Sequence, residues 1–236
     1  MTLVAILGMH RSGTSAVAGM LAEHGVDFGP VRTKNRFNRR GNRELPELNK
    51  LHEELLERSG GKWWDPPASV EVTAEDAGRR DEILATIKGD PAAVKDPRIL
   101  LCRDLWSGVD LKRIGVIRNP VSVRRSLARR AAERPHRHPQ FSDRQWEDLW
   151  ATYNRALLAE HERSAFPVLD FDRDYDLERQ VVDALRYWRI EAGGDSGFFD
   201  RDLVAQPSAA DWRAEASSEE ALEVWDALTA ITVTGP

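Results

Sequence analysis

The chain has 236 residues, of which 41% are hydrophobic and 31% charged, and its formal net charge is −5. This length and apolar content suit one α/β domain with a hydrophobic core, and they exclude wholesale disorder. No apolar run is long enough to span a membrane, and the single cysteine, Cys102, excludes an intrachain disulfide and a cysteine metal cluster. The chain starts in an apolar run without a basic region, so we expect no signal peptide and a cytoplasmic location.

The first predicted elements are a buried strand at residues 3–7, a glycine-bounded loop at 8–15 and a helix at 14–24. In this order, the backbone N–H groups of the loop and the helix N-terminus face an anion. A loop for nucleoside triphosphates requires a lysine after its second glycine, where this chain has Thr14. Arg11 instead supplies a cation three residues earlier. The loop therefore predicts a site for a phosphate-like group that is poorly suited to Mg-ATP.

The remaining predicted elements alternate between strands and helices. Strands are expected at residues 26–28, ending at 94, at 113–117 and at 166–171. Helices are expected at residues 45–58, 75–87, 98–105, 121–133, 144–162, 176–187 and 219–230. This alternation predicts a three-layer, P-loop-like α/β fold, in which a central parallel sheet is flanked by helices and ligands bind at the C-terminal ends of the strands.

Two groups of aromatic residues differ in their predicted role. The helix at 144–162 carries large side chains at helical spacing, which we interpret as core: Trp146, Leu149, Trp150 and Tyr153. Trp63 and Trp64 lie between a glycine pair and a proline pair in a loop. They could stack on a sugar or aromatic acceptor, or they could anchor the core.

A second motif begins where the strand at 113–117 ends. Arg118-Asn119-Pro120 breaks the strand, and Pro120 fits the first turn of the helix that follows. Ser126 comes eight residues after Arg118, about two helical turns into that helix. An arginine at a strand end and a serine on the next helix can together hold a second phosphate.

The helix of this second motif is rich in arginine. We interpret most of these side chains as a solvated helix face: Arg124, Arg125, Arg129, Arg130 and Arg134. A basic patch can also indicate nucleic-acid binding. We do not expect a nucleic-acid partner, because the arginines lie beside a phosphate loop and the sequence contains no nucleic-acid-binding motif.

Together, the two motifs resemble those of sulfotransferases that use 3′-phosphoadenosine 5′-phosphosulfate (PAPS), in a bacterial branch of that family. Arg11-Ser12-Gly13-Thr14-Ser15 is similar to the family's 5′-phosphosulfate loop, and Arg118 through Ser126 to its 3′-phosphate motif. Lys95-Asp96-Pro97-Arg98 resembles a recurrent segment of this branch. The resemblance covers about residues 3–190. It implies a single sulfotransferase-like domain over residues 1–236, with a helical or loop insertion at 33–90 over the acceptor site.

The resemblance implies that a sulfuryl group moves from PAPS to a hydroxyl, less often an amine, of a small-molecule or carbohydrate acceptor. The in-line transfer would need no metal and would leave adenosine 3′,5′-bisphosphate, with positioning and charge stabilisation supplying most of the catalysis. Arg11 would neutralise charge at the bridging oxygen. The 5′-phosphate would be held by the loop residues Ser12, Gly13, Thr14 and Ser15. Arg118 and Ser126 would hold the 3′-phosphate and reject nucleotides that lack it.

The acceptor hydroxyl needs a base, and two residues are candidates. Glu44 ends the segment Asn38-Arg39-Arg40-Gly41-Asn42-Arg43-Glu44, and related sulfotransferases often carry a glutamate in such an Asn-x-x-Gly-x-x-Glu context. A glutamate at this place also suits the start of the helix at 45–58. His10 lies inside the phosphate loop, where a neutral imidazole can act as a base or orient the loop. The sequence leaves this choice open.

Lys95, Asp96 and Arg98 follow the strand that ends at residue 94, at the edge where the site should lie. Lys95 could stabilise the transferring group or have no catalytic part. We expect Asp96 to cap the following helix or to pair with Arg98, as structural support.

Two other classes of protein are compatible with the pattern. A P-loop kinase or NTPase would need a lysine after Gly13 and an acidic metal ligand at a strand end, for which Asp96 is the nominal candidate. A non-catalytic nucleotide-binding protein would keep the fold without turnover. The acceptor and the oligomeric state do not follow from the sequence, and we expect specificity to reside in the loops at 30–43, 60–74 and 134–145.

Overall fold

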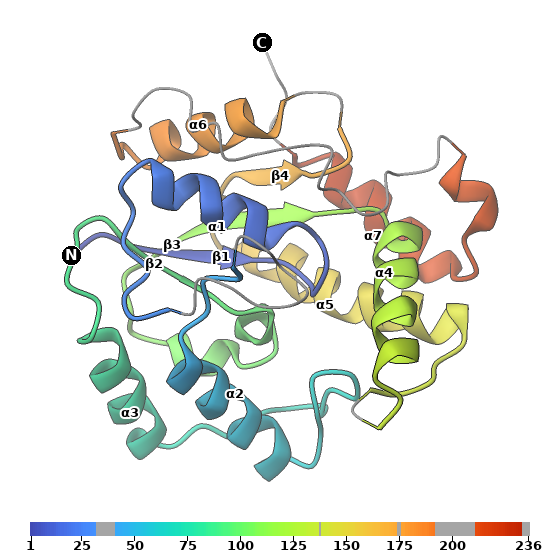
Figure 1. The fold of residues 1–236 in the computed structure, drawn as a ribbon, viewed down its shortest axis with the longest axis horizontal. Helices are drawn as coiled ribbons and strands as arrows, with labels where there is room; N and C mark the ends of the chain where they lie inside the picture. Colours follow the sequence, from blue (N-terminus) through green and yellow to red (C-terminus); the bar gives the residue numbers. More distant parts are fainter. Residues whose placement is uncertain (32–40, 137, 174–175, 192–210, 233–236) are drawn as a thin grey trace.

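The computed structural model describes residues 1–31, 41–136, 138–173, 176–191 and 211–232. Within them, four parallel strands form a sheet in the order β2-β1-β3-β4 (Figure 1). The strands are β1 (Leu3–Leu7), β2 (Ala92–Lys95), β3 (Leu111–Ile117) and β4 (Val168–Asp170). The predicted α/β fold with a central parallel sheet is confirmed.

Helices cover both faces of the sheet. They are α1 (Thr14–Glu23), α2 (Pro46–Arg58), α3 (Ala74–Leu84), α4 (Pro120–Glu133), α5 (Asp143–Arg163), α6 (Leu177–Tyr187) and α7 (Glu219–Thr229). Figure 1 shows α1 and α6 together on one face, and their buried residues form one hydrophobic cluster. The buried residues of α2, α5 and α7 belong to a second cluster on the opposite face. These two clusters and the sheet between them make the three layers.

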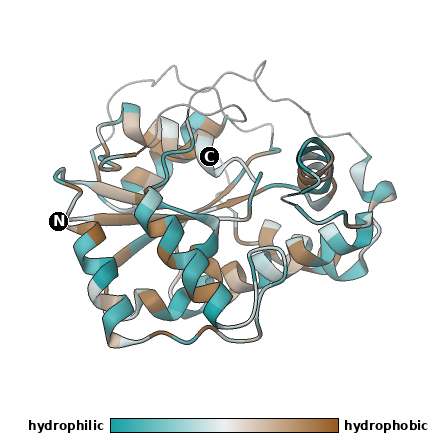
Figure 2. Ribbon diagram, turned by 60° about the horizontal axis from the view of Figure 1, so that its bottom comes forward, coloured by the Kyte–Doolittle hydropathy of each residue, from teal (hydrophilic) through white to brown (hydrophobic). Residues whose placement is uncertain are grey.

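The sequence of β1 shows how one strand serves both clusters. All five residues of β1 are buried. Val4 and Ile6 belong to the cluster of α1 and α6, whereas Leu3, Ala5 and Leu7 belong to the opposite cluster, as the alternation of side chains along a strand requires. In Figure 2 the strands are mostly hydrophobic in colour, while the surrounding helices carry both hydrophobic and hydrophilic residues.

The strand predicted at residues 26–28 does not form. Asp27 makes only an isolated bridge to Ala92. Its carboxylate accepts hydrogen bonds from the backbone N–H groups of Gly29 at 2.8 Å and Gly89 at 2.7 Å. An aspartate side chain that binds the backbone two residues later stabilises a turn, and this turn ends the extended conformation after Asp27. The helix predicted at 98–105 also differs from the structure, which has two short 3₁₀ helices there, at Pro97–Leu100 and Arg103–Trp106.

The aromatic face of α5 is core, as predicted. Trp146, Trp150 and Tyr153 are among the largest fully buried side chains. The Trp150 indole donates a hydrogen bond to the carbonyl oxygen of Arg118 at 3.0 Å, and the Tyr153 hydroxyl donates one to the carbonyl oxygen of Trp63 at 2.8 Å. Helix α5 thereby fixes two segments that lie near the C-terminal ends of the strands.

The arginines of α4 do not all lie on a solvated face. Arg129 is exposed, but Arg124 is buried, with its Nη1 2.6 Å from Oε1 of the buried Glu147. The prediction is wrong for Arg124, because the C-terminal segment and α5 pack over that side of the helix and supply carboxylates. Among the described residues, no helix has the length and apolar content to span a membrane.

Candidate functional site

The loop between β1 and α1 has a backbone that requires glycine at position 13. Arg11 and Gly13 both have positive φ angles, of 72° and 94°. A Cβ atom on Gly13 would overlap the ring of Phe171, which follows β4. Glycine thus lets the loop pass close to Phe171, after the end of β4, and turn sharply into α1.

The start of α1 offers hydrogen-bond donors to an anion. The first N–H groups of a helix have no intrahelical acceptor. Helix α1 begins at Thr14 without a capping side chain, so no side chain at its N-cap accepts from them either. The Ser12 hydroxyl is buried and has no hydrogen-bond partner among the described residues. Donors of this kind at a helix N-terminus make a site for an anion such as a phosphate.

Arg11 links the loop to the second motif. Its Nε donates a hydrogen bond to the Ser126 hydroxyl at 2.8 Å, although 115 residues separate the two in sequence. Burial, together with the nearby charges of Arg130, Arg129 and Arg118, lowers the pKa of Arg11 to about 10. Arg11 therefore stays protonated near neutral pH. Bound anions would reduce the repulsion between these neighbouring cations.

Arg118 is held at the end of β3 by an acid that sequence analysis missed. It is buried, its Nε lies 3.3 Å from Oδ1 of Asp172, and its guanidinium lies 5.0 Å from the centre of the Phe171 ring. Asp172 also accepts hydrogen bonds from the backbone N–H and side-chain amide of Asn119, each at 2.7 Å. The only signal in the sequence is an acid directly after the last predicted strand. Burial lowers the pKa of Arg118, and Asp172 opposes the shift.

Glu44 and Lys95, considered separately in the sequence, form an ion pair. Lys95 is buried at the end of β2, with its Nζ 2.5 Å from Oε1 of Glu44 and 3.2 Å from the Ser15 hydroxyl. The second carboxylate oxygen of Glu44 accepts hydrogen bonds from the side-chain amides of Asn42 at 2.8 Å and Asn49 at 2.9 Å. The pair therefore lies against the phosphate loop. The predicted segment around Glu44 starts at Asn38, and its residues 38–40 lie outside the described part of the chain, as do residues 32–37 of the predicted loop.

His10 packs into the protein beneath the loop. Its ring centre lies 4.4 Å from that of Trp63 and 6.0 Å from that of Tyr153. Its Nε2 is buried and has no hydrogen-bond partner among the described residues. Burial, together with the charge of Arg98, holds the pKa of His10 well below its ordinary value, so the imidazole is neutral.

Asp96 and Arg98 have the structural part predicted for them. Asp96 caps the following 3₁₀ helix and lies 3.0 Å from Nη1 of Arg98 and 2.8 Å from Nδ1 of His52. Burial opposes its ionisation, but the charges of Arg98 and His52 prevail and lower the pKa of Asp96. Within the described residues, no three His, Cys, Asp or Glu side chains are grouped as a metal ion would require.

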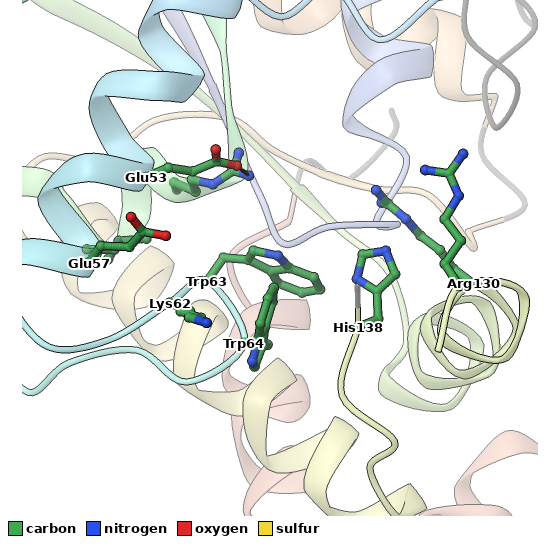
Figure 3. A pocket seen from close by; sticks show the side chains of 10 residues that line it. Glu53, Glu57, Lys62, Trp63, Trp64, Arg130 and His138 are labelled. Atoms are coloured by element: carbon green, nitrogen blue, oxygen red, sulfur yellow. Dashed lines mark hydrogen bonds and ion pairs between the residues drawn. The ribbon is translucent and has the colours of Figure 1, made fainter. Parts of the chain in front are cut away.

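A cavity of about 320 Å³ lies next to the loop (Figure 3). Its lining comes from α2, the turn that follows α2, the first 3₁₀ helix, α4 and the segment after α4. The lining residues are Glu53, Leu56, Glu57, Lys62, Trp63, Trp64, Arg98, Arg130, Arg134 and His138. Because Trp63 contacts both the cavity and His10, the cavity and the phosphate loop share a wall. The two tryptophans were candidates from the sequence, whereas the proximity of Arg130, Arg134 and His138 to them was not predicted.

Two solved structures are similar to the chain over nearly their whole lengths. The sulfotransferase domain from the Synechococcus PCC 7002 olefin synthase matches with a TM-score of 0.57 and 18% identity, covering 100% of this chain and 96% of that domain. The sulfotransferase domain from the curacin biosynthetic pathway matches with a TM-score of 0.56 and 15% identity, covering 97% of each chain. No model of a protein family matches the sequence, and no curated protein matches it. The chain has the fold of these sulfotransferase domains, as the resemblance predicted.

Proposed function

We propose that the protein is a sulfotransferase that uses PAPS and acts on a hydroxyl, or less often an amine, of a small-molecule or carbohydrate acceptor. The observation that carries this proposal is the hydrogen bond between Arg11 and Ser126. It joins the loop suited to a 5′-phosphosulfate to the helix suited to a 3′-phosphate. PAPS carries phosphates at both the 3′ and the 5′ positions, whereas a nucleoside triphosphate carries all of its phosphates at the 5′ position.

The residues present fit such a donor. PAPS supplies, when bound, a sulfuryl group on a phosphate leaving group. The loop N–H groups and the hydroxyls of Ser12, Thr14 and Ser15 hold the 5′ end, where the buried Ser12 hydroxyl needs a partner. Arg118 and Ser126 hold the 3′-phosphate, and Arg11 stabilises charge at the bridging oxygen.

The surroundings of Ser15 support transfer without a metal and weigh against a kinase or NTPase. Ser15 stands where P-loop enzymes place the hydroxyl that binds Mg²⁺. Here the ammonium group of Lys95 donates a hydrogen bond to the Ser15 hydroxyl oxygen at 3.2 Å, so the oxygen that would bind the metal is already engaged. The other nominal metal ligand, Asp96, already pairs with Arg98 and His52.

Glu44 is the better placed of the two candidate bases. It is partly exposed and lies against the loop through Lys95, whereas Nε2 of His10 is buried against the core. An acceptor hydroxyl that replaced an asparagine amide at Oε2 of Glu44 could pass its proton to the carboxylate. Protonation would weaken the pair with Lys95 and leave the ammonium charge for the transferring group. We assign His10 to orienting the loop through its contact with Trp63.

The whole chain, residues 1–236, would then form one sulfotransferase domain. Helices α2 and α3 belong to the predicted insertion at 33–90, whose residues 33–40 lie outside the described part of the chain. The insertion supplies much of the lining of the cavity, including Glu53, Glu57, Lys62, Trp63 and Trp64. The insertion thereby forms the acceptor side of the site.

Calorimetry with adenosine 3′,5′-bisphosphate, ADP and ATP, each with and without Mg²⁺, tests the proposal. We expect the bisphosphate to bind tightest, with an affinity that Mg²⁺ does not change. Preference for ATP with Mg²⁺ would overturn the proposal and indicate a divergent kinase. Binding of the bisphosphate without sulfuryl transfer to any hydroxyl acceptor tested would indicate the non-catalytic class.

A further inference from the structure

The aromatic residues of the cavity form a corner. The rings of Trp63 and Trp64 are 5.2 Å apart and nearly perpendicular, at 88°. The His138 ring lies 5.9 Å from Trp63 and 6.3 Å from Trp64. Trp63 is fixed by the hydrogen bond from Tyr153 to its carbonyl oxygen, while Trp64 remains half-buried. Such a corner offers flat apolar surfaces to the face of a ring.

Charges in the cavity are unevenly distributed. Figure 3 shows Glu53 and Glu57 on one side of the aromatic residues and Arg130 on the other. Arg98 lies 2.5 Å from Glu53 and 3.0 Å from Asp96, so two carboxylates neutralise it. Besides Arg98 and Glu53, the described lining includes three more cations and one more acid: Lys62, Arg130, Arg134 and Glu57.

Arg130 lies between the phosphate loop and the cavity. Its charge reaches Arg11 in the loop and lowers the pKa of that residue. Burial lowers the pKa of Arg130 itself, and the charge of Arg134 adds to the shift while Glu44 opposes it. Guanidinium groups thus continue from the proposed donor site into the cavity.

We propose that the acceptor is a ring-bearing molecule with an anionic substituent, its ring against Trp63 and Trp64 and its anion bound by Arg130 and Arg134. This inference rests on the proposed sulfotransferase function and narrows its acceptor. Guanidinium groups suit a carboxylate, sulfate or phosphate, because they can donate two parallel hydrogen bonds to it. An aromatic acid and a sugar acid share this chemistry, and the probes below separate them.

Calorimetry on the full chain, saturated with adenosine 3′,5′-bisphosphate, tests the inference with two matched pairs of probes. The aromatic pair is 4-hydroxyphenylacetate and its neutral alcohol, 4-hydroxyphenethyl alcohol. The sugar pair is methyl glucuronide and methyl glucoside. We expect the acid of one pair to bind at least about tenfold tighter than its neutral partner, as a charge-assisted hydrogen bond provides. The pair that shows this preference identifies the kind of ring.

Variants near the C-terminal end of α4 locate the anion site. Arg130→Gln and Arg134→Gln should each reduce the preference for the acid to within about threefold. Arg125→Gln is the matched control, because Arg125 lies on the same helix, pairs with Glu215 and does not line the cavity. It should leave the preference unchanged.

Each outcome decides between the two proposals. If the bisphosphate binds but both acids bind no better than their neutral partners, or neither acid binds, the acceptor inference is wrong and the sulfotransferase proposal stands. The same holds if Arg130→Gln and Arg134→Gln bind the bisphosphate and keep the full preference for the acid. If the bisphosphate itself does not bind, the proposed function fails, and the acceptor inference fails with it.

Discussion

The phosphate loop and the cavity beside Trp63 are neighbours, yet they are held in place by different means. The loop and Arg118 are attached to the ends of β1 and β3, and Phe171 and Asp172 at the end of β4 support them. The cavity is lined by α2, by the turn at Trp63 and Trp64, and by segments around α4. Residues of the proposed donor side are therefore positioned by the sheet, and residues of the proposed acceptor side by packing between helices. The donor side should tolerate substitution least, and the acceptor side should change specificity without losing donor binding.

Substitution of the loop arginine should have the largest effect. Arg11→Ala removes the cation nearest the bridging oxygen and the bond to Ser126, so we expect sulfuryl transfer to fall by about a thousandfold. Transfer from PAPS is measured with an acceptor identified by the binding experiments above. Arg125→Ala is the control and should stay within about twofold of the unsubstituted protein. An active Arg11→Ala protein would show that the loop is not the donor site.

Glu44→Gln should separate the chemistry from donor binding. The amide keeps the size of the side chain but cannot accept the acceptor's proton, so turnover should fall by about a hundredfold. Affinity for adenosine 3′,5′-bisphosphate should change by less than about threefold, because Glu44 reaches the loop only through Lys95. Unchanged turnover would remove the base assignment, and His10→Gln would then be the next variant to measure.

More of the proposed donor side than of the proposed acceptor side could be predicted from the sequence. Strand, loop and helix follow one another in the chain, so the spacing of Arg11 to Ser15 and of Arg118 to Ser126 could be interpreted directly. The pair of Glu44 and Lys95 could not be predicted, because it depends on β2 lying beside β1. Asp172 was missed for the same reason, since its partners lie at the end of β3.

The errors in the predicted fold have local and tertiary causes. The short strand at 26–28 was predicted from apolar residues that flank Asp27. The carboxylate of Asp27 instead accepts a hydrogen bond from the backbone N–H of Gly29. The strand propensity of Val26 and Phe28 does not outweigh the turn that this bond stabilises. Arg124 was grouped with arginines most of which were expected to face solvent, because helical periodicity does not reveal that Glu147 of α5 packs against it. Likewise, nothing local predicts that His138 meets Trp63 and Trp64.

Asp170 gives the donor side a dependence of stability on pH. Burial raises the pKa of Asp170 to about 6, against an ordinary value of about 3.9. Its ionisation therefore lowers the free energy of unfolding progressively between about pH 4 and pH 6, and the full cost is present above that range. Asp170→Asn should raise the free energy of unfolding by about 1–3 kcal/mol at about pH 8 and by little at about pH 4.

Urea unfolding of Asp170→Asn at both pH values measures this effect. Asp104→Asn is the control, because Asp104 is exposed and its change should be small at either pH. Equal stabilisation of Asp170→Asn at the two pH values would contradict the burial argument.

Trp64→Leu should have the smallest effect and act on the acceptor side alone. The half-buried indole would no longer face an acceptor ring, so KM for the acceptor should rise by about three- to tenfold. Affinity for adenosine 3′,5′-bisphosphate should not change. Trp212→Leu replaces a tryptophan that is also half-buried but packs on Trp225, and it should leave KM unchanged. Equal effects of the two variants would count against an acceptor in the cavity.

The central claim is that two distant motifs form one site for two phosphates. Calorimetry with adenosine 3′,5′-bisphosphate and with adenosine 5′-monophosphate, on the unsubstituted protein and on Arg118→Gln, tests it most directly. We expect the bisphosphate to bind at least about a hundredfold tighter than the monophosphate, because only its 3′-phosphate can accept charge-assisted hydrogen bonds from Arg118 and Ser126. Arg118→Gln should reduce this ratio to within about tenfold and leave monophosphate affinity unchanged. Equal affinity for the two nucleotides in the unsubstituted protein would contradict the claim.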